Sequence, residues 1–238
     1  MKILIVHAHP EPRSFCSVLS RFAHDTLMEQ GHEVMCSDLY GQGFNPVASA
    51  ADFSQRGQSD YMLSALDQRL DADGETIAAD IQAEIDKVRA ADLVIFTFPI
   101  YWFSSPAILK GWFDRAFVSG LFCGGLRAYG RRGMVGKRAL FAATIGGPEY
   151  LFGQDGLHGQ LMCLFKHQLQ GTLAFAGFDV LPPFIAHHVP YFTQDEREAV
   201  MHDWQTCLLN LGSATPLPMP GLIGQLAQAP ALADEVLL

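Results

Sequence analysis

The sequence predicts an α/β fold in which a doubly wound, five-stranded parallel sheet carries helices on both faces. Short, uninterrupted apolar runs alternate with longer segments of helical periodicity, as strands buried between two helical layers do. A length of 238 residues suits one large domain. The chain is 49% hydrophobic and 17% charged, which is typical of a globular protein.

Strands and helices are predicted in strict alternation. The predicted strands cover residues 2–7, 33–37, 92–98, 138–145 and 178–186. The predicted helices cover residues 14–30, 76–90, 106–118, 159–176 and 193–211. A long polar connection, residues 38–75, precedes the second helix, and such connections are usually functional or mobile. The domain is expected to span residues 1–212, with a C-terminal tail over 213–238.

Composition excludes several functional classes. The formal net charge is −9, and phosphate binding by nucleic-acid proteins needs clustered basic residues, so no nucleic-acid partner is expected. The five cysteines are scattered, with no Cys-x-x-Cys pair, which favours a reducing compartment and no metal site. No run approaches the ~20 apolar residues of a membrane span, so the expected location is the cytoplasm, without membrane insertion.

The loops that follow strands one, three and four are expected to form the functional site. Parallel sheets bind ligands beyond the carboxyl ends of their strands. The loops in question are residues 8–14, 99–105 and 146–158.

The first loop lacks a Gly-x-Gly-x-x-Gly pattern and a phosphate-loop lysine. It does offer His9, Arg13 and Ser14 at the start of a helix, where backbone N–H groups bind phosphate. The alternative is a simple helix cap.

The other two loops point to a flat ligand. Tyr101, Trp102 and Phe103 are consecutive aromatic residues at a strand end. A flat fused-ring ligand would cover their faces. The alternative is that they pack into the core or against a second subunit. Gly146 and Gly147 let backbone approach a ligand closely. His158, between two glycines, is either a proton donor near the ligand or a structural residue.

Several motifs in order resemble the NAD(P)H:quinone oxidoreductase family, the DT-diaphorase type within the flavodoxin-like fold. The resemblance runs from about residue 2 to residue 212. Its most specific stretches are Ser37-Asp-Leu-Tyr40, Phe44-Asn-Pro46, Ala90 to Phe96, Pro99 to Arg115, Gly146-Gly147, Gly156-Leu-His-Gly159 and Phe175-Ala-Gly-Phe178.

The resemblance implies a tightly held flavin, FAD with FMN as the alternative. The flavin-binding residues that it implies are His9, Ser14, Phe15, Cys16, Pro99, Ile100, Tyr101, Trp102, Phe103, Asp114, Thr144, Ile145, Gly146, Gly147 and Arg197. The substrate slot that it implies is lined by Trp102, Phe103, Tyr129, His158 and Phe175. His158 is the expected catalytic residue.

The chain departs from the family pattern at positions that matter for chemistry. The family pairs its active-site histidine with a tyrosine six positions earlier, and that position is Phe152 here. Tyr150 would take the role if the loop is rearranged, so it is the second candidate catalytic residue. Two further family tyrosines are replaced by Cys123 and Gly125, and Tyr129 would fill part of that space.

The function that the resemblance implies is two-electron hydride transfer from NADH or NADPH to a quinone. Donor and acceptor would use one slot in turn, by ping-pong kinetics, in a homodimer. The apolar segments 117–126 and 150–157 are expected to be exposed and to need cover from a second subunit. The alternative is a flavin-binding ancillary subunit of a potassium-efflux system, which a membrane transporter would retain in a pull-down. A flavodoxin-type electron carrier is a third possibility, disfavoured by the first loop, which is not rich in hydroxyl groups.

Overall fold

The computed structural model describes residues 1–54, 60–71, 77–123 and 133–219. Its elements follow in the order β1 (Lys2–His7), α1 (Phe15–Glu29), β2 (Glu33–Asp38), the short helix η1 (Ala50–Asp52), α2 (Ser64–Asp71), α3 (Ala79–Ala90), β3 (Leu93–Pro99), α4 (Ala107–Ala116), β4 (Arg138–Thr144), η2 (Glu149–Phe152), α5 (Leu161–Gln168), the π-helix η3 (Leu169–Ala174), β5 (Asp179–Val180), β6 (Phe184–Ala186) and α6 (Gln194–Leu209).

The sheet is parallel, with the strand order β2-β1-β3-β4-β5, and β6 also pairs with β4. The predicted doubly wound parallel sheet is therefore confirmed. Its switch point lies between β1 and β3, because the chain runs from β1 outward to β2 and then returns to the other side of β1. β3 is buried along its whole length, whereas the edge strand β2 is largely exposed.

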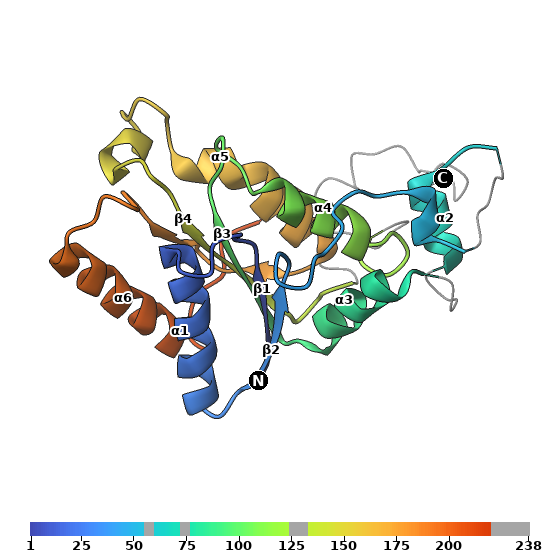
Figure 1. Cartoon of the computed structure of the whole chain (residues 1–238), viewed down its shortest axis with the longest axis horizontal. Helices are drawn as coiled ribbons and strands as arrows, with labels where there is room; N and C mark the ends of the chain where they lie inside the picture. The colour runs from blue at the N-terminus through green and yellow to red at the C-terminus, as the bar shows by residue number, and fades with distance from the viewer. Residues whose placement is uncertain (55–59, 72–76, 124–132, 220–238) are drawn as a thin grey trace.

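Helices cover both faces of the sheet (Figure 1). One face packs against α1 and α6, through a core that includes Leu19, Leu27, Trp204 and Leu208. The other face packs against α3, α4 and α5 in a larger core. Both layers cover the central strands, which explains why those strands have no polar face. Among the described residues, no helix is long and apolar enough to cross a membrane.

The fifth predicted strand, residues 178–186, is divided in two. β5 pairs with the first residues of β4, and β6 pairs with Ala142–Thr144 at its other end. Pro182 and Pro183 lie between the two pieces. Proline has no N–H to donate to a strand ladder, so these residues interrupt the predicted strand.

One helix boundary, the form of another helix and the burial of one segment also differ from expectation. α3 begins at Ala79 because Ile77 is extended and forms a bridge with Phe53. The predicted helix over 159–176 contains the π-helix η3. In the segment expected to be exposed after α4, Val118 and Phe122 are buried. The rings of Phe117 and Phe122 stack at 5.0 Å, so the described part of this segment packs inward.

Candidate functional site

A cavity of about 420 Å³ opens at the carboxyl ends of β1, β3 and β4. The first loop, the start of the third loop and the end of β4 meet there, together with the segment that leads into α6. We call it the strand-end cavity, and its lining residues are His9, Arg13, Ser14, Phe15, Pro99, Ile100, Tyr101, Thr144, Ile145, Gly146, Val189, Pro190 and Arg197. Most of the residues expected to bind one ligand are therefore close together.

The strand-end cavity is basic in an acidic chain. Among the described residues that line it, Arg13 and Arg197 are cationic and none is a carboxylate, although the chain carries a net charge of −9. Glu11 pairs with Arg13 at 3.0 Å. The Arg197 guanidinium instead lies 5.3 Å from the ring centroid of Phe15 and 5.8 Å from that of Phe192. A guanidinium held by aromatic faces keeps its donors available for an anion.

The N-terminus of α1 adds to this positive potential, and a hydrogen-bond chain holds it in place. Ser14 caps the helix, because its Oγ accepts from the Ser17 N–H. The Ser17 hydroxyl donates to the Glu11 carbonyl and lies 3.0 Å from His7 Nε2. His7 Nδ1 lies 2.8 Å from the Thr97 hydroxyl, so this imidazole links β1, β3 and α1.

His7 was not among the residues predicted from sequence, although a lone polar residue at the end of an apolar strand was a usable signal. Burial lowers its pKa, which favours the neutral ring. Each ring nitrogen of His7 thus has a hydroxyl partner, Thr97 at Nδ1 and Ser17 at Nε2. His7 therefore holds the first loop in place relative to β1 and β3.

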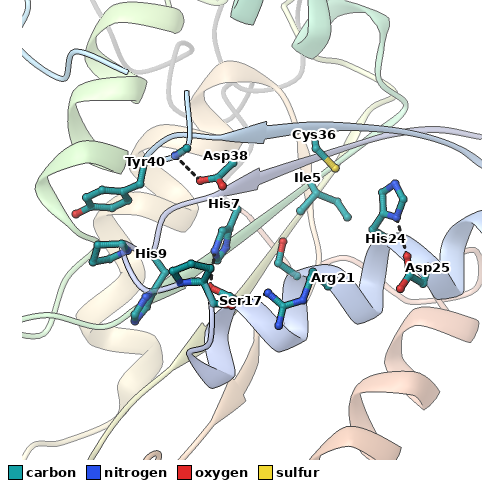
Figure 2. Close-up of a pocket in the computed structure, with 14 residues that line it drawn as sticks. Ile5, His7, His9, Ser17, Arg21, His24, Asp25, Cys36, Asp38 and Tyr40 are labelled. Carbon is teal, nitrogen blue, oxygen red and sulfur yellow. Dashed lines mark hydrogen bonds and ion pairs between the residues drawn. The ribbon is translucent and has the colours of Figure 1, made fainter. Parts of the chain in front are cut away.

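A second cavity, of about 540 Å³, lies on the far side of the first loop, between α1 and β2 (Figure 2). Arg21 and His24 from α1 face Cys36 and Asp38 from β2 across it. Arg21 donates to the Pro12 carbonyl at 2.6 Å, which braces the loop from this side. His9 lines both cavities, and burial lowers its pKa.

The loop that follows β3, residues 99–105, forms a tight turn beside the strand-end cavity. Tyr101 and Ser104 exchange both backbone hydrogen bonds, each at 3.0 Å. The two residues between them, Trp102 and Phe103, have φ values of 48° and 62°. Left-handed backbone is strained for residues with a side chain, by roughly 1–3 kcal/mol each, and such strain clusters at functional sites. The turn presents Trp102 with 95% of its surface exposed.

His158 lies behind this turn, between two phenyl rings. Its imidazole centroid is 5.0 Å from that of Phe103 and 5.2 Å from that of Phe152. Gly147 is required here, because an added Cβ would lie 2.8 Å from Phe152 Cε2. The Tyr150 side chain, by contrast, is 77% exposed.

His187 is a second histidine beside Phe152, with ring centroids 5.8 Å apart, and sequence reasoning missed it. Burial lowers its pKa. Its position beside Phe152 could not be read from the sequence. His187 directly follows the predicted strand 178–186, and none of the three loops that we expected to form the site includes it.

Some predicted residues lie elsewhere. Cys16 is buried below the cavity lining, and burial raises the pKa of its thiol to about 12. Asp114 pairs with Lys110 and lines a third cavity, of about 540 Å³, together with Phe175. Asp114 and Phe175 are therefore separate from the residues that line the strand-end cavity. Tyr129 lies outside the described residues.

Comparisons with known proteins agree with the fold of this chain. A family model described as the flavodoxin-like fold matches residues 1–208. Ribosyldihydronicotinamide dehydrogenase [quinone] of Pongo abelii is 37% identical over 219 residues, which cover 91% of this chain and 94% of the relative. NAD(P)H dehydrogenase [quinone] 1 of Rattus norvegicus is 35% identical and covers 91% and 79%.

A solved structure from Klebsiella pneumoniae, assigned as a quinone reductase, superposes with a TM-score of 0.87 at 34% identity. It covers 92% of this chain and 87% of its own. Fold, strand order and near-complete sequence matches agree, and the chain belongs to the flavodoxin-like fold family and, within it, to the NAD(P)H:quinone oxidoreductase family.

Proposed function

We propose that the chain is a flavin-dependent NAD(P)H:quinone oxidoreductase that transfers two electrons as hydride by ping-pong kinetics through one shared slot. The observation that carries the proposal is the strand-end cavity. It is basic, its walls include backbone from two strand ends, and it lies beside a strained aromatic turn.

The residues present fit a flavin nucleotide. The α1 N-terminus, His9 and Ser14 suit its phosphate. Backbone of Pro99 to Tyr101 and of Thr144 to Gly146 offers donors and acceptors to the polar edge of the ring system. An added Cβ at Gly146 would lie 3.3 Å from the Val189 carbonyl oxygen, so a side chain would narrow the cavity at this wall.

FAD is favoured over FMN by Arg197. This residue lies at the start of α6, away from the aromatic turn in sequence, and stacks over Phe15 and Phe192. A cation held on aromatic rings at the cavity rim suits the second nucleotide half. The family resemblance implies that Arg197 matches an arginine beside the adenine of FAD.

The chain's own residues would orient the reactants. When bound, a flavin supplies the hydride chemistry, accepting from NAD(P)H and delivering to the quinone. Trp102 and Phe103 would cover the slot in which donor and acceptor bind in turn. His158 would donate a hydrogen bond or a proton where negative charge develops.

A homodimer with sites between subunits is part of the proposal. Exposed apolar side chains gather near His158: Trp102 is 95% exposed and Leu157 is 83% exposed. Such side chains are normally covered by a ligand or by another subunit. Sedimentation that shows a fully active monomer would exclude this part.

The central experiment is cofactor identification followed by titration. The purified protein should carry a yellow cofactor whose released mass is that of FAD. Arg197→Gln should weaken FAD binding about 10-fold and leave FMN binding unchanged, because only FAD reaches the arginine. Arg89→Gln, at an exposed position of α3 outside the lining of the strand-end cavity, is the matched control and should leave both unchanged. A colourless protein that takes up neither flavin would end the proposal.

A further inference from the structure

The second cavity, between α1 and β2, has opposite charges on its two walls, and we call it the α1–β2 cavity (Figure 2). Ser17, Arg21 and His24 line it from α1. They are four and three residues apart, so they lie on the same side of the helix. Cys36 and Asp38 alternate along β2 and line it from the other wall. A guanidinium on one wall therefore faces a carboxylate on the other.

Arg21 and Asp38 are each held by loop backbone and do not pair with each other. Arg21 Nη1 donates to the Pro12 carbonyl at 2.6 Å. Asp38 Oδ1 accepts from the Gly41 N–H at 3.0 Å. Neither side chain forms an ion pair with another described residue. After burial, which lowers the pKa of His7, the charges that act on this ring include Asp38, which raises the pKa, and Arg21, which lowers it. Both charges therefore lie near one ring without neutralising each other.

The other titratable groups on the walls do not balance these two charges. The Asp25 carboxylate already has a partner, because it lies 2.9 Å from His24 Nδ1. Burial lowers the pKa of His9 and raises that of the Cys36 thiol, and both shifts favour the neutral form. The α1–β2 cavity thus offers a ligand one cation and one anion, whereas the lining of the strand-end cavity offers cations without a carboxylate.

The remaining walls of the α1–β2 cavity are apolar. Ile5, Pro10, Pro12 and Tyr40 line it, and its volume is about 540 Å³. Apolar walls with a few convergent polar groups are typical of small-molecule sites. A guanidinium binds a carboxylate through paired N–H groups, and a carboxylate accepts from an ammonium. A ligand that matches these walls carries a carboxylate, an ammonium and an apolar group.

We propose that the α1–β2 cavity binds a free α-amino acid with an apolar side chain, whose carboxylate accepts from Arg21 and whose ammonium donates to Asp38. A phosphate-bearing ligand fits these walls less well, because the carboxylates of Asp25 and Asp38 would repel it. The α1–β2 cavity shares one lining residue, His9, with the strand-end cavity. The amino-acid site is therefore separate from the slot proposed for hydride transfer, and its test needs no turnover.

Three probes with the same phenyl ring separate the two charges of the ligand. L-Phenylalanine carries both charges, 2-phenylethylamine lacks the carboxylate, and 3-phenylpropionate lacks the ammonium. Isothermal titration of the purified full-length protein measures the affinity for each probe. We expect L-phenylalanine to bind about 10-fold more tightly than either of the other two, the effect of one charged hydrogen bond.

Two variants should each remove one preference and keep the other. Arg21→Gln should bind L-phenylalanine and 2-phenylethylamine equally, because the carboxylate has lost its partner, and should still bind 3-phenylpropionate more weakly. Asp38→Asn should bind L-phenylalanine and 3-phenylpropionate equally and still bind 2-phenylethylamine more weakly. Arg89→Gln and Asp203→Asn are the matched controls, since both residues are exposed and lie outside the cavity lining. Both controls should keep both preferences.

Several outcomes would overturn the proposal. Equal binding of the three probes to the parent protein would do so without any variant, as would binding of none or tighter binding of a singly charged probe. Both preferences surviving in Arg21→Gln and in Asp38→Asn would place the amino acid elsewhere. Loss of both preferences together in each variant would show that Arg21 and Asp38 only hold the loops in shape.

Discussion

Two tryptophans of this protein occupy opposite environments. Trp204 on α6 is fully buried, its indole N–H donates to the Leu19 carbonyl at 3.0 Å, and its ring lies 4.7 Å from that of Phe184. Trp102 is almost fully exposed on a turn whose backbone is left-handed. Trp204 has every partner that it needs within the chain. Trp102 is held in a strained conformation with almost no packing, which is how residues at ligand sites are commonly found.

The largest expected effect is on stability, at Trp204. Trp204→Ala should lower the free energy of unfolding by about 3–5 kcal/mol, because it opens a large cavity and removes the indole hydrogen bond to the Leu19 carbonyl. Urea denaturation measures this. Trp204→Phe should lose clearly less, since the ring contact with Phe184 survives. Flavin affinity of the folded fraction should not change in either variant, and a large drop there would place Trp204 in the site.

The next effect concerns catalysis at His158. His158→Ala should slow flavin reduction by NAD(P)H about 10²-fold in stopped-flow measurements, as expected for the loss of one positioned donor. The protein should remain folded and yellow. A variant that is reduced as fast as the parent would leave His158 with a structural role between Phe103 and Phe152.

Tyr150 and Phe152 decide whether a hydroxyl shares this task. Tyr150 is mostly exposed, whereas Phe152 contacts the His158 ring. Tyr150→Phe should therefore leave the reduction rate within about twofold, and Phe152→Tyr should leave it unchanged or raise it modestly. A large loss in Tyr150→Phe would mean that the loop rearranges when reactants bind.

Trp102 should show the reverse of Trp204. Trp102→Gly should weaken flavin or acceptor binding by about 10-fold, because an aromatic contact is lost. It should also leave unfolding stability unchanged or raise it by up to about 1 kcal/mol, because glycine relieves the positive φ. Titration of flavin and urea denaturation of the apoprotein separate the two quantities. If the effects at Trp102 and Trp204 were exchanged, the site would lie on other loops.

The smallest effect is a pH dependence from His7. Its folded pKa is lowered by burial, whereas an unfolded histidine titrates near 6.5. Below about pH 6.5 the unfolded chain therefore binds more protons at this residue, and stability falls until the folded pKa is reached. His7→Gln should reduce the loss of stability between pH 7.5 and 5.5, whereas the exposed His202→Gln should not. An equal loss in the parent and in His7→Gln would assign the acid sensitivity to other groups.

The parts of the site that follow from strand order were predictable from sequence. Parallel strands place their carboxyl ends together, so the sequence alone was enough to assign Ser14, Tyr101 and Gly146 to one cavity. The positions of Asp114 and Phe175 could not be assigned in this way, since they depend on which side of α4 and η3 faces a cavity.

The end of the described chain packs along the β5 side of the sheet. The Leu217 N–H donates to the Val180 carbonyl at 2.8 Å, and Arg138 donates to the carbonyls of Leu211 and Ala214. An open strand edge is a template for pairing with another chain and hence for aggregation. The segment 210–219 thus provides a donor to the Val180 carbonyl of β5. A shortened chain that stops at the end of α6 would leave this carbonyl open to pairing with another chain.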